Sequence, residues 1–251
     1  MDFYDTYDEN GVFQCSADES DVHYKGLWHK VIRVWLYDED GNIYLRVRKS
    51  DNKLDCINEL HVLSSESAVE CFDRGMYEKL GVHFSATSEI EQAYQRKKQF
   101  SKVYSDNTEI KDNYFLCDYI GEFSNTTSYF LFSDDTAGLV KVNARGISNF
   151  LGIKTGEIIG YEVQPFGGAG DIRRFIKIDD IYDDRKDDLF LKYNFVVTTI
   201  MRNSAQREKI KREDEKIRRL IEKSRIGRDS ASSGPSGYKS HADDNEGIDI
   251  Y

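Results

Sequence analysis

The sequence predicts an α/β fold in which a mixed sheet has helices on both sides. Two β-rich runs, 31–37 and 43–48, are joined by the polar turn 38–42, which is the pattern of a hairpin. Residues 66–80 place apolar side chains at the spacing of one helical face. The chain has 251 residues, of which 39% are hydrophobic and 13% aromatic, so it can bury a substantial core.

Further strands are expected where β-rich segments are bounded by Gly, Asp or Asn. These segments are 113–120, 128–132, 138–142, 158–163 and 172–178. Helices are expected at 66–80, 144–151 and 187–225. Gly81 is expected to end the first helix, and no residue breaks the last one.

Charge divides the chain into three segments. The formal net charge is −10, but residues 202–228 hold eleven Lys or Arg against five Asp or Glu, and residues 229–251 hold one Lys against five acids. We therefore expect an acidic domain over 1–201, a charged amphipathic helix over 202–226 and a disordered acidic tail over 227–251. The tail is rich in Ser, Gly and Asp, so it cannot bury enough apolar area to offset its chain entropy.

Composition disfavours several classes of protein. No apolar run approaches the roughly 18–20 residues that span a bilayer, and no basic start leads into an apolar signal core, so no membrane partner is expected. The four cysteines are far apart and form no CxxC, which disfavours a zinc knot or disulfide scaffold and indicates a reducing cytoplasm. An acidic body repels phosphates, so nucleic acid is disfavoured as a partner.

Four charged side chains recur at intervals of four along the helix expected at 66–80. Glu66, Glu70, Arg74 and Glu78 therefore lie on one face of it. An arginine can brace the carboxylates on either side, and a braced row of carboxylates can hold a hard cation such as Mg²⁺. The alternative is a solvated ladder of ion pairs, which is common on helix faces.

The same residues resemble the second half of the box that marks the Nudix hydrolase superfamily. Glu66 is followed after seven residues by Arg74, and then by Glu78 and the Leu-Gly-Val run 80–82. Members of that superfamily hydrolyse diphosphates linked to another group, with Mg²⁺ or Mn²⁺ bound by carboxylates of this helix. The resemblance implies catalytic roles for three residues: Glu78 as a metal ligand, with Glu66 and Arg74 orienting the helix.

The N-terminal part resembles the isopentenyl-diphosphate-isomerase-like branch of that superfamily. Its members open with an acidic stretch like 3–11, a His-x-x-Gly-x-Trp-His motif like 23–29 and a hairpin. His61 falls where the branch has a Gly-His pair, and Glu109 resembles its later carboxylate before a strand. The resemblance covers roughly residues 1–200 and implies a Nudix-type α/β/α sandwich for that region.

Three departures from the box weaken the implied hydrolase activity. The box glycine is replaced by Leu60, the Arg-Glu pair has become Arg74-Gly75, and the Glu-Glu pair has become Glu78-Lys79. Two of the three metal carboxylates that the family has in this helix are therefore lost. Lys79 also places a positive charge where a cation would bind, which opposes metal affinity.

Two functions are consistent with this degraded box. The favoured one is a pseudoenzyme, which serves as a binding or scaffolding module for a diphosphate-containing small molecule or for a protein. The alternative is an active Mg²⁺- or Mn²⁺-dependent hydrolase in which Glu78 and Glu109 hold the metal. Isomerase activity is disfavoured, because Glu59 stands where isomerases have their catalytic cysteine.

His23, His29 and His61 form a second candidate centre. In the isomerases, histidines and a carboxylate at similar places bind a divalent metal. Three imidazoles together with the carboxylate of Glu109 would suit Zn²⁺ or Mn²⁺. The alternative is that the histidines are retained without a metal, as in related hydrolases.

The charged helix at 207–223 carries a thin apolar stripe. Ile210 and Ile217 are seven residues apart, and Leu220 and Ile221 are nearby. One interpretation is a short coiled coil or docking helix, which would give a homo-oligomer or a complex with another protein. The other is a solvated extension that is stabilised by ion pairs along the helix.

Overall fold

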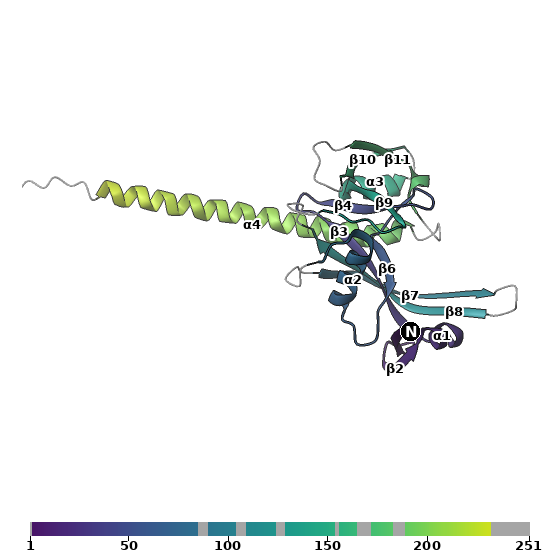
Figure 1. Cartoon of the computed structure of the whole chain (residues 1–251). Helices are drawn as coiled ribbons and strands as arrows, with labels where there is room; N and C mark the ends of the chain where they lie inside the picture. Colours follow the sequence, from purple (N-terminus) through teal and green to yellow (C-terminus); the bar gives the residue numbers. More distant parts are fainter. Residues whose placement is uncertain are drawn as a thin grey trace, which may run out of the picture. The chain divides into compact units, whose positions relative to one another are not determined.

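The computed structural model describes residues 2–84, 90–103, 109–123, 129–153, 156–164, 172–182 and 189–231 (Figure 1). The chain divides into two compact units, Met1–Ala205 and Gln206–Tyr251. In the second unit, the described residues 206–231 are helical. Within the described ranges, no helix is long and apolar enough to cross a membrane.

The described residues of the first unit form eleven strands in two sheets. The strands are β1 (Phe3–Tyr7), β2 (Phe13–Asp18), β3 (His29–Tyr37), β4 (Asn42–Arg48), β5 (Leu54–Asp55), β6 (Asn58–His61), β7 (Ile90–Val103), β8 (Glu109–Glu122), β9 (Thr136–Asn143), β10 (Ile158–Val163) and β11 (Ile172–Ile176). β1 and β2 form a small antiparallel sheet. The large sheet runs β11-β10-β9-β4-β3-β8-β7, with β5 paired to β4 and β6 paired to β3. It is mixed, because β3 and β8 are parallel and their other neighbours are antiparallel.

Helices cover both faces of the large sheet, which gives three layers (Figure 1). The helices are α1 (Glu19–Lys25), α2 (Ala68–Leu80), α3 (Ala144–Ile153) and α4 (Leu189–Ala231), and a short 3-10 helix, η1, covers Ile178–Asp180. On one face α2 packs against β3 and β4, with a core that includes Ile32, Val34, Leu36, Tyr44, Phe72 and Met76. On the other face α3 and the start of α4 pack against the sheet, with a core that includes Trp35, Leu45, Val140, Ile147, Tyr193 and Val197.

Strand β3 lies between β4 and β8 in the large sheet, and both of its faces are buried. Successive side chains of a strand point to opposite faces, so Val34 faces α2 while Trp35 faces α4. This is why residues 31–37 are apolar on both faces of the strand, except for the buried Arg33. The layers confirm the predicted α/β sandwich with helices on both sides of a mixed sheet.

Helix α2 has a clear signal at each end. The Ser67 hydroxyl accepts a hydrogen bond from the Glu70 backbone N–H, and the Glu70 carboxylate accepts one from the Ser67 N–H at 2.8 Å, which is a capping box. Gly81, with φ of 65°, ends the helix, and a Cβ there would lie 2.6 Å from the Leu131 Cβ. Glycine is therefore required at this turn. The helix predicted at 66–80 is confirmed, with its first turn starting two residues later.

Several local expectations need correction. Residues 129–132 were expected in a strand but are irregular. The Leu131 N–H donates to Leu80 O at the end of α2, so this segment is bonded to the helix and not to a strand of the sheet. The tail was expected from 227, but α4 continues to Ala231, since adding a residue to a formed helix costs far less than starting one. The remaining tail, 232–251, lies outside the described residues.

Candidate functional site

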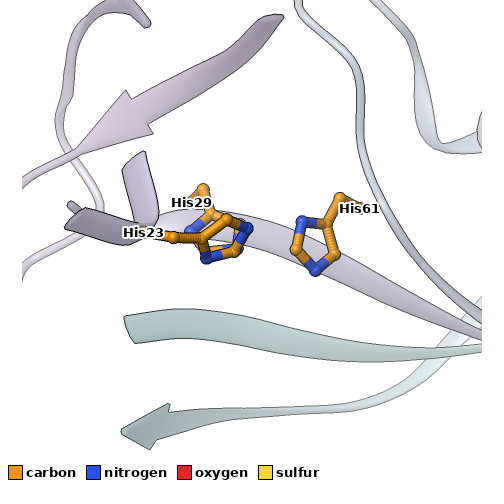
Figure 2. Close-up of side chains that lie close together, drawn as sticks. All are labelled: His23, His29 and His61. Carbon is orange, nitrogen blue, oxygen red and sulfur yellow. The ribbon is translucent and has the colours of Figure 1, made fainter. Parts of the chain in front are cut away.

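Three histidines from separate parts of the chain lie together beside the large sheet (Figure 2). His23 comes from α1, His29 is the first residue of β3, and His61 is the last residue of β6. Each can offer one ring nitrogen, and these nitrogens all lie within 4.8 Å of one another. The structure therefore brings together the three histidines that the sequence indicated.

Strand register places two of these histidines on the same face of the sheet. His61 is paired with Val31 on the antiparallel neighbour β3. Paired residues share a face, and residues two apart on a strand share it as well. His29 lies two residues before Val31, so its ring points to the same side as the ring of His61.

His23 is held over this face by the short helix α1. The Asp18 carboxylate caps the start of α1 by accepting from the Asp21 N–H at 3.0 Å. Gly26 ends the helix in the left-handed conformation, with φ of 65°, and a Cβ there would lie 2.9 Å from the Lys111 Cβ. The side-chain amide of Asn113 donates to Gly26 O at 2.8 Å, which ties the end of α1 to β8.

A carboxylate that the sequence did not single out completes the group. Asp112 Oδ1 lies 3.4 Å from His29 Nε2 and 3.6 Å from His23 Nδ1. His29 is paired with Tyr114 on the parallel strand β8, and Asp112 lies two residues before Tyr114, on the same face. We refer to His23, His29, His61 and Asp112 as the histidine centre.

Glu109, which the sequence offered as the carboxylate of this centre, lies elsewhere. It is three residues before Asp112 on β8, and an odd separation puts two side chains on opposite faces of a strand. Its exposed carboxylate accepts from the Ser101 hydroxyl at 2.7 Å and is 3.4 Å from Lys111 Nζ. The parity of β8 is the signal that distinguishes Asp112 from Glu109, once the strand is known to begin at Glu109.

Burial keeps the imidazoles of His29 and His61 in their neutral form. His29 is fully buried, and burial lowers its pKa to about 4. Burial and the neighbouring imidazoles lower the pKa of His61 to about 3. His29 Nδ1 is 3.1 Å from Leu27 O, and because a carbonyl only accepts, Nδ1 carries the proton. Nε2 therefore points a bare lone pair into the centre, the form that binds a metal.

Three atoms of the histidine centre are buried and have no hydrogen-bond partner among the described residues. They are His29 Nε2, His61 Nδ1 and Asp112 Oδ1. An unsatisfied buried polar atom costs about 1–3 kcal/mol, so three of them around one point need an explanation. Around a tetrahedral ion with bonds of about 2.0–2.1 Å, neighbouring ligand atoms are about 3.3 Å apart. The separations of 3.4 and 3.6 Å are close to that, and the histidine nitrogens lie within 4.8 Å of one another, so these residues could hold a divalent transition metal.

Tyr4 covers the histidine centre. Its ring stacks on His29 with centroids 5.8 Å apart and meets the edge of His61 at 5.0 Å. Only 5% of Tyr4 is exposed, and burial raises its pKa to about 12, so the phenol stays neutral. The ring excludes water from the two imidazoles, which strengthens any charge interaction inside.

The residues of the degraded box form an ion-pair ladder on α2. Arg74 Nε donates to Glu66 Oε1 at 2.8 Å, Arg74 Nη2 donates to Glu66 Oε2 at 2.9 Å, and Arg74 Nη1 donates to Glu78 Oε1 at 3.1 Å. Glu66 Oε2 also accepts from the Leu63 N–H at 2.9 Å. Burial would raise the pKa of Glu66, but the hydrogen bonds from Arg74 and Leu63 outweigh it and lower that pKa. Both carboxylates are thus engaged by one guanidinium.

The two altered box positions do not supply metal ligands. Gly75 is buried, and a Cβ there would lie 3.0 Å from both Leu60 Cδ2 and Val34 Cγ2, so a longer side chain would press on the core. Lys79 Nζ lies 2.6 Å from Asp135 Oδ2, which is also 3.1 Å from Arg46 Nη1. Although burial opposes it, hydrogen bonds from Lys79 and Ser133 hold the pKa of Asp135 far below its usual range. Position 79 therefore holds an ammonium group that is paired with Asp135.

Comparisons with known proteins give structural likenesses only. No family model matches the chain, and no curated protein matches it. Similar solved structures include a protein of Deinococcus radiodurans (19% identity, 60% of this chain and 88% of that chain, TM-score 0.41). They also include a MutT/Nudix family protein from Enterococcus faecalis (17% identity, 67% of this chain and 61% of that chain, TM-score 0.37). A third is the dihydroneopterin triphosphate pyrophosphohydrolase of E. coli (15% identity, 47% of this chain and 83% of that chain, TM-score 0.32). All three TM-scores are below 0.5, so these likenesses do not by themselves assign the chain to a family.

Proposed function

We propose that residues 1–201 are a Nudix-type domain that has lost diphosphate hydrolysis and works as a binding module. The observation that carries this proposal is the contact of 2.6 Å between Lys79 Nζ and Asp135 Oδ2. Lys79 occupies a box position where the resemblance implies a metal carboxylate. The ammonium group of Lys79 neutralises the Asp135 carboxylate and repels Mg²⁺.

The alternative, an active Mg²⁺- or Mn²⁺-dependent hydrolase, would need carboxylates that are free to bind the ion. Glu78 is the one box carboxylate that remains of three, and Arg74 and the Asn58 side-chain amide both donate to it. Glu109, its expected companion, is on the outer part of the β7–β8 hairpin with Ser101 and Lys111. A metal stabilises developing charge on phosphate through direct ligands, so this arrangement favours binding of a diphosphate-containing molecule without turnover.

The full-length protein should therefore show no hydrolysis of nucleoside or sugar diphosphates with Mg²⁺ or Mn²⁺. Mg²⁺ should also leave its melting temperature unchanged, whereas Lys79→Glu should create a Mg²⁺-dependent rise, because an ion that binds only the folded state stabilises it. Lys79→Gln removes the charge without adding a ligand and should show no such rise. Turnover on the order of 1 s⁻¹ that Glu78→Gln abolishes would contradict the proposal.

A second part of the proposed function is metal binding at the histidine centre. The three imidazoles and the Asp112 carboxylate are donors that suit Zn²⁺ or Mn²⁺. When bound, such an ion would supply a Lewis-acidic centre and would link α1, β3, β6 and β8. The chain's own residues supply the rest: Leu27 O fixes the tautomer of His29, and Tyr4 packs against the rings of His29 and His61.

The helical part of the second unit provides a surface for a protein partner, and we take that partner to be a second copy of the chain. Ile210, Ile217, Leu220 and Ile221 are 48–65% exposed, and Ile210 and Ile217 are one heptad apart. With Ile210 at an a position, Lys209 is at g and Asp214 at the following e. In a parallel pair of helices, each Lys209 would face the Asp214 of the other copy, so charge and apolar contact favour the same register.

Changing both stripe isoleucines to lysine, as Ile210→Lys with Ile217→Lys, should abolish self-association of the full chain, because it puts like charges in the seam. The matched control is Glu208→Lys with Glu215→Lys, which adds two lysines on the opposite side of the helix and should leave the association intact. Sedimentation velocity over a range of protein concentrations measures both. A wild-type chain that stays monomeric throughout would show that the helix is a solvated extension.

A further inference from the structure

We propose that Glu66 and Arg74, two of the three charged residues that survive from the box, position His61 for metal binding rather than serve diphosphate hydrolysis. The proposal rests on the metal centre proposed above, since it concerns how one ligand of that centre is held. Both residues act through the backbone that leads from His61 to the start of α2. They are therefore positioning residues and not ligands.

The contacts of the pair converge on this backbone. Arg74 Nη2 donates to His61 O at 2.8 Å, and the Glu66 carboxylate accepts from the Leu63 N–H at 2.9 Å. The Glu66 N–H in turn donates to Leu63 O at 3.0 Å. Because Arg74 lies on α2, these bonds attach the segment 61–66 to a capped helix that packs on the core.

His61 is the ligand whose position depends most on such an attachment. It is the last residue of β6, and the Val62 N–H gives the bond to Lys30 O that ends the pairing with β3. Its ring nitrogen Nδ1 is buried and has no hydrogen-bond partner among the described residues, so no side-chain bond there fixes the ring. His29, in contrast, lies against Leu27 O, which sets its tautomer. The hydrogen bond from Arg74 to His61 O fixes the peptide group that follows the His61 Cα, and this in turn fixes the direction of the His61 side chain.

The geometry also explains why arginine is needed at 74. Its guanidinium reaches Glu66, His61 O and Glu78 at the same time, all at 2.8–3.1 Å. A lysine is a point charge without this planar fork and cannot reproduce the three directions. Such outer partners of a metal ligand typically change metal affinity by about 10–100-fold when they are lost.

Titration of the full-length protein with Co²⁺, followed by its visible absorption, tests this inference. Arg74→Gln and Glu66→Gln should each weaken Co²⁺ binding by about 10–100-fold and alter the spectrum of the bound ion, and Arg74→Lys should recover only part of the loss. Arg48→Gln and Glu70→Gln are matched controls, because neither side chain contacts the segment 61–66 in any hydrogen bond or ion pair of the described residues. Both should bind like the wild type.

The background of His61→Ala separates positioning from a general loss of stability. If Arg74 acts through His61, Arg74→Gln should cause no further loss of Co²⁺ affinity in that background, since coupled residues are not additive. The inference would be overturned if Arg74→Gln weakened Co²⁺ binding equally with and without His61. It would also be overturned if Arg74→Gln alone left Co²⁺ binding unchanged, although the proposed metal centre would then still stand. A wild-type protein that binds no Co²⁺ would overturn the metal centre and this inference together.

Discussion

Replacing His29 with alanine should weaken the binding of Zn²⁺ to the full-length protein by about 100-fold or more. His29 is fully buried, its Nε2 has no hydrogen-bond partner among the described residues, and it lies 3.4 Å from Asp112. Losing a direct ligand should cost more than the roughly 10–100-fold that follows the loss of an outer partner. Competition with a chromophoric chelator measures the affinity.

The same change should remove the thermal stabilisation by Zn²⁺. At a free concentration 100 times its dissociation constant, a ligand stabilises the folded state by about 2.7 kcal/mol, which for a domain of this size is about 5–10 °C in melting temperature. The matched control is His83→Ala. The His83 side chain is 70% exposed and pairs with Asp73 and Tyr77, so this variant should bind and respond as the wild type does.

Two further substitutions decide which carboxylate belongs to the centre. Asp112→Asn should weaken Zn²⁺ binding, because Asp112 Oδ1 is 3.4 Å from His29 Nε2. Glu109→Gln should leave it unchanged, because the Glu109 carboxylate is held by Ser101 and Lys111 on the opposite face of β8. The reverse pattern would restore the ligand set expected from the sequence and contradict the geometry described above.

Local signals were sufficient for the elements that lie against the core. The α2 helix could be predicted because its apolar period and Gly81 both act within one element. Strand β7 could not, since it carries Gln, Arg and Lys at the edge of the sheet, and most of its side chains are partly or fully exposed. The β1–β2 hairpin was missed for a similar reason, because every residue of β2 is at least partly exposed.

The histidine centre could be predicted only by resemblance, because its geometry depends on long-range pairing. His29 and Asp112 meet through the parallel register of β3 with β8, and His61 joins them through the register of β6 with β3. No local pattern contains these registers. Glu109 was named because it resembles a carboxylate that precedes a strand, whereas the face of a strand on which a side chain lies is decided by parity.

Replacing Arg33 with methionine should lower the free energy of unfolding by about 3–5 kcal/mol. Arg33 is 1% exposed, and its guanidinium lies 2.8 Å from Glu59 Oε2 and 3.4 Å from Asp118 Oδ1. The Trp35 Nε1–H also donates to Asp118 Oδ1, at 2.8 Å. Without Arg33, the equally buried Asp118 would lose its cation and remain as a charge in the core. Urea unfolding followed by Trp fluorescence measures the loss.

The second substitution Asp118→Asn should recover part of this stability, because the pair Arg33→Met with Asp118→Asn no longer buries an unpaired charge. A surface arginine gives the comparison. The side chain of Arg212 is 75% exposed beside Glu208, so Arg212→Met should lower the free energy of unfolding by less than about 1 kcal/mol. A cost below about 1 kcal/mol for Arg33→Met would mean that the buried pair of Arg33 and Asp118 contributes little to stability.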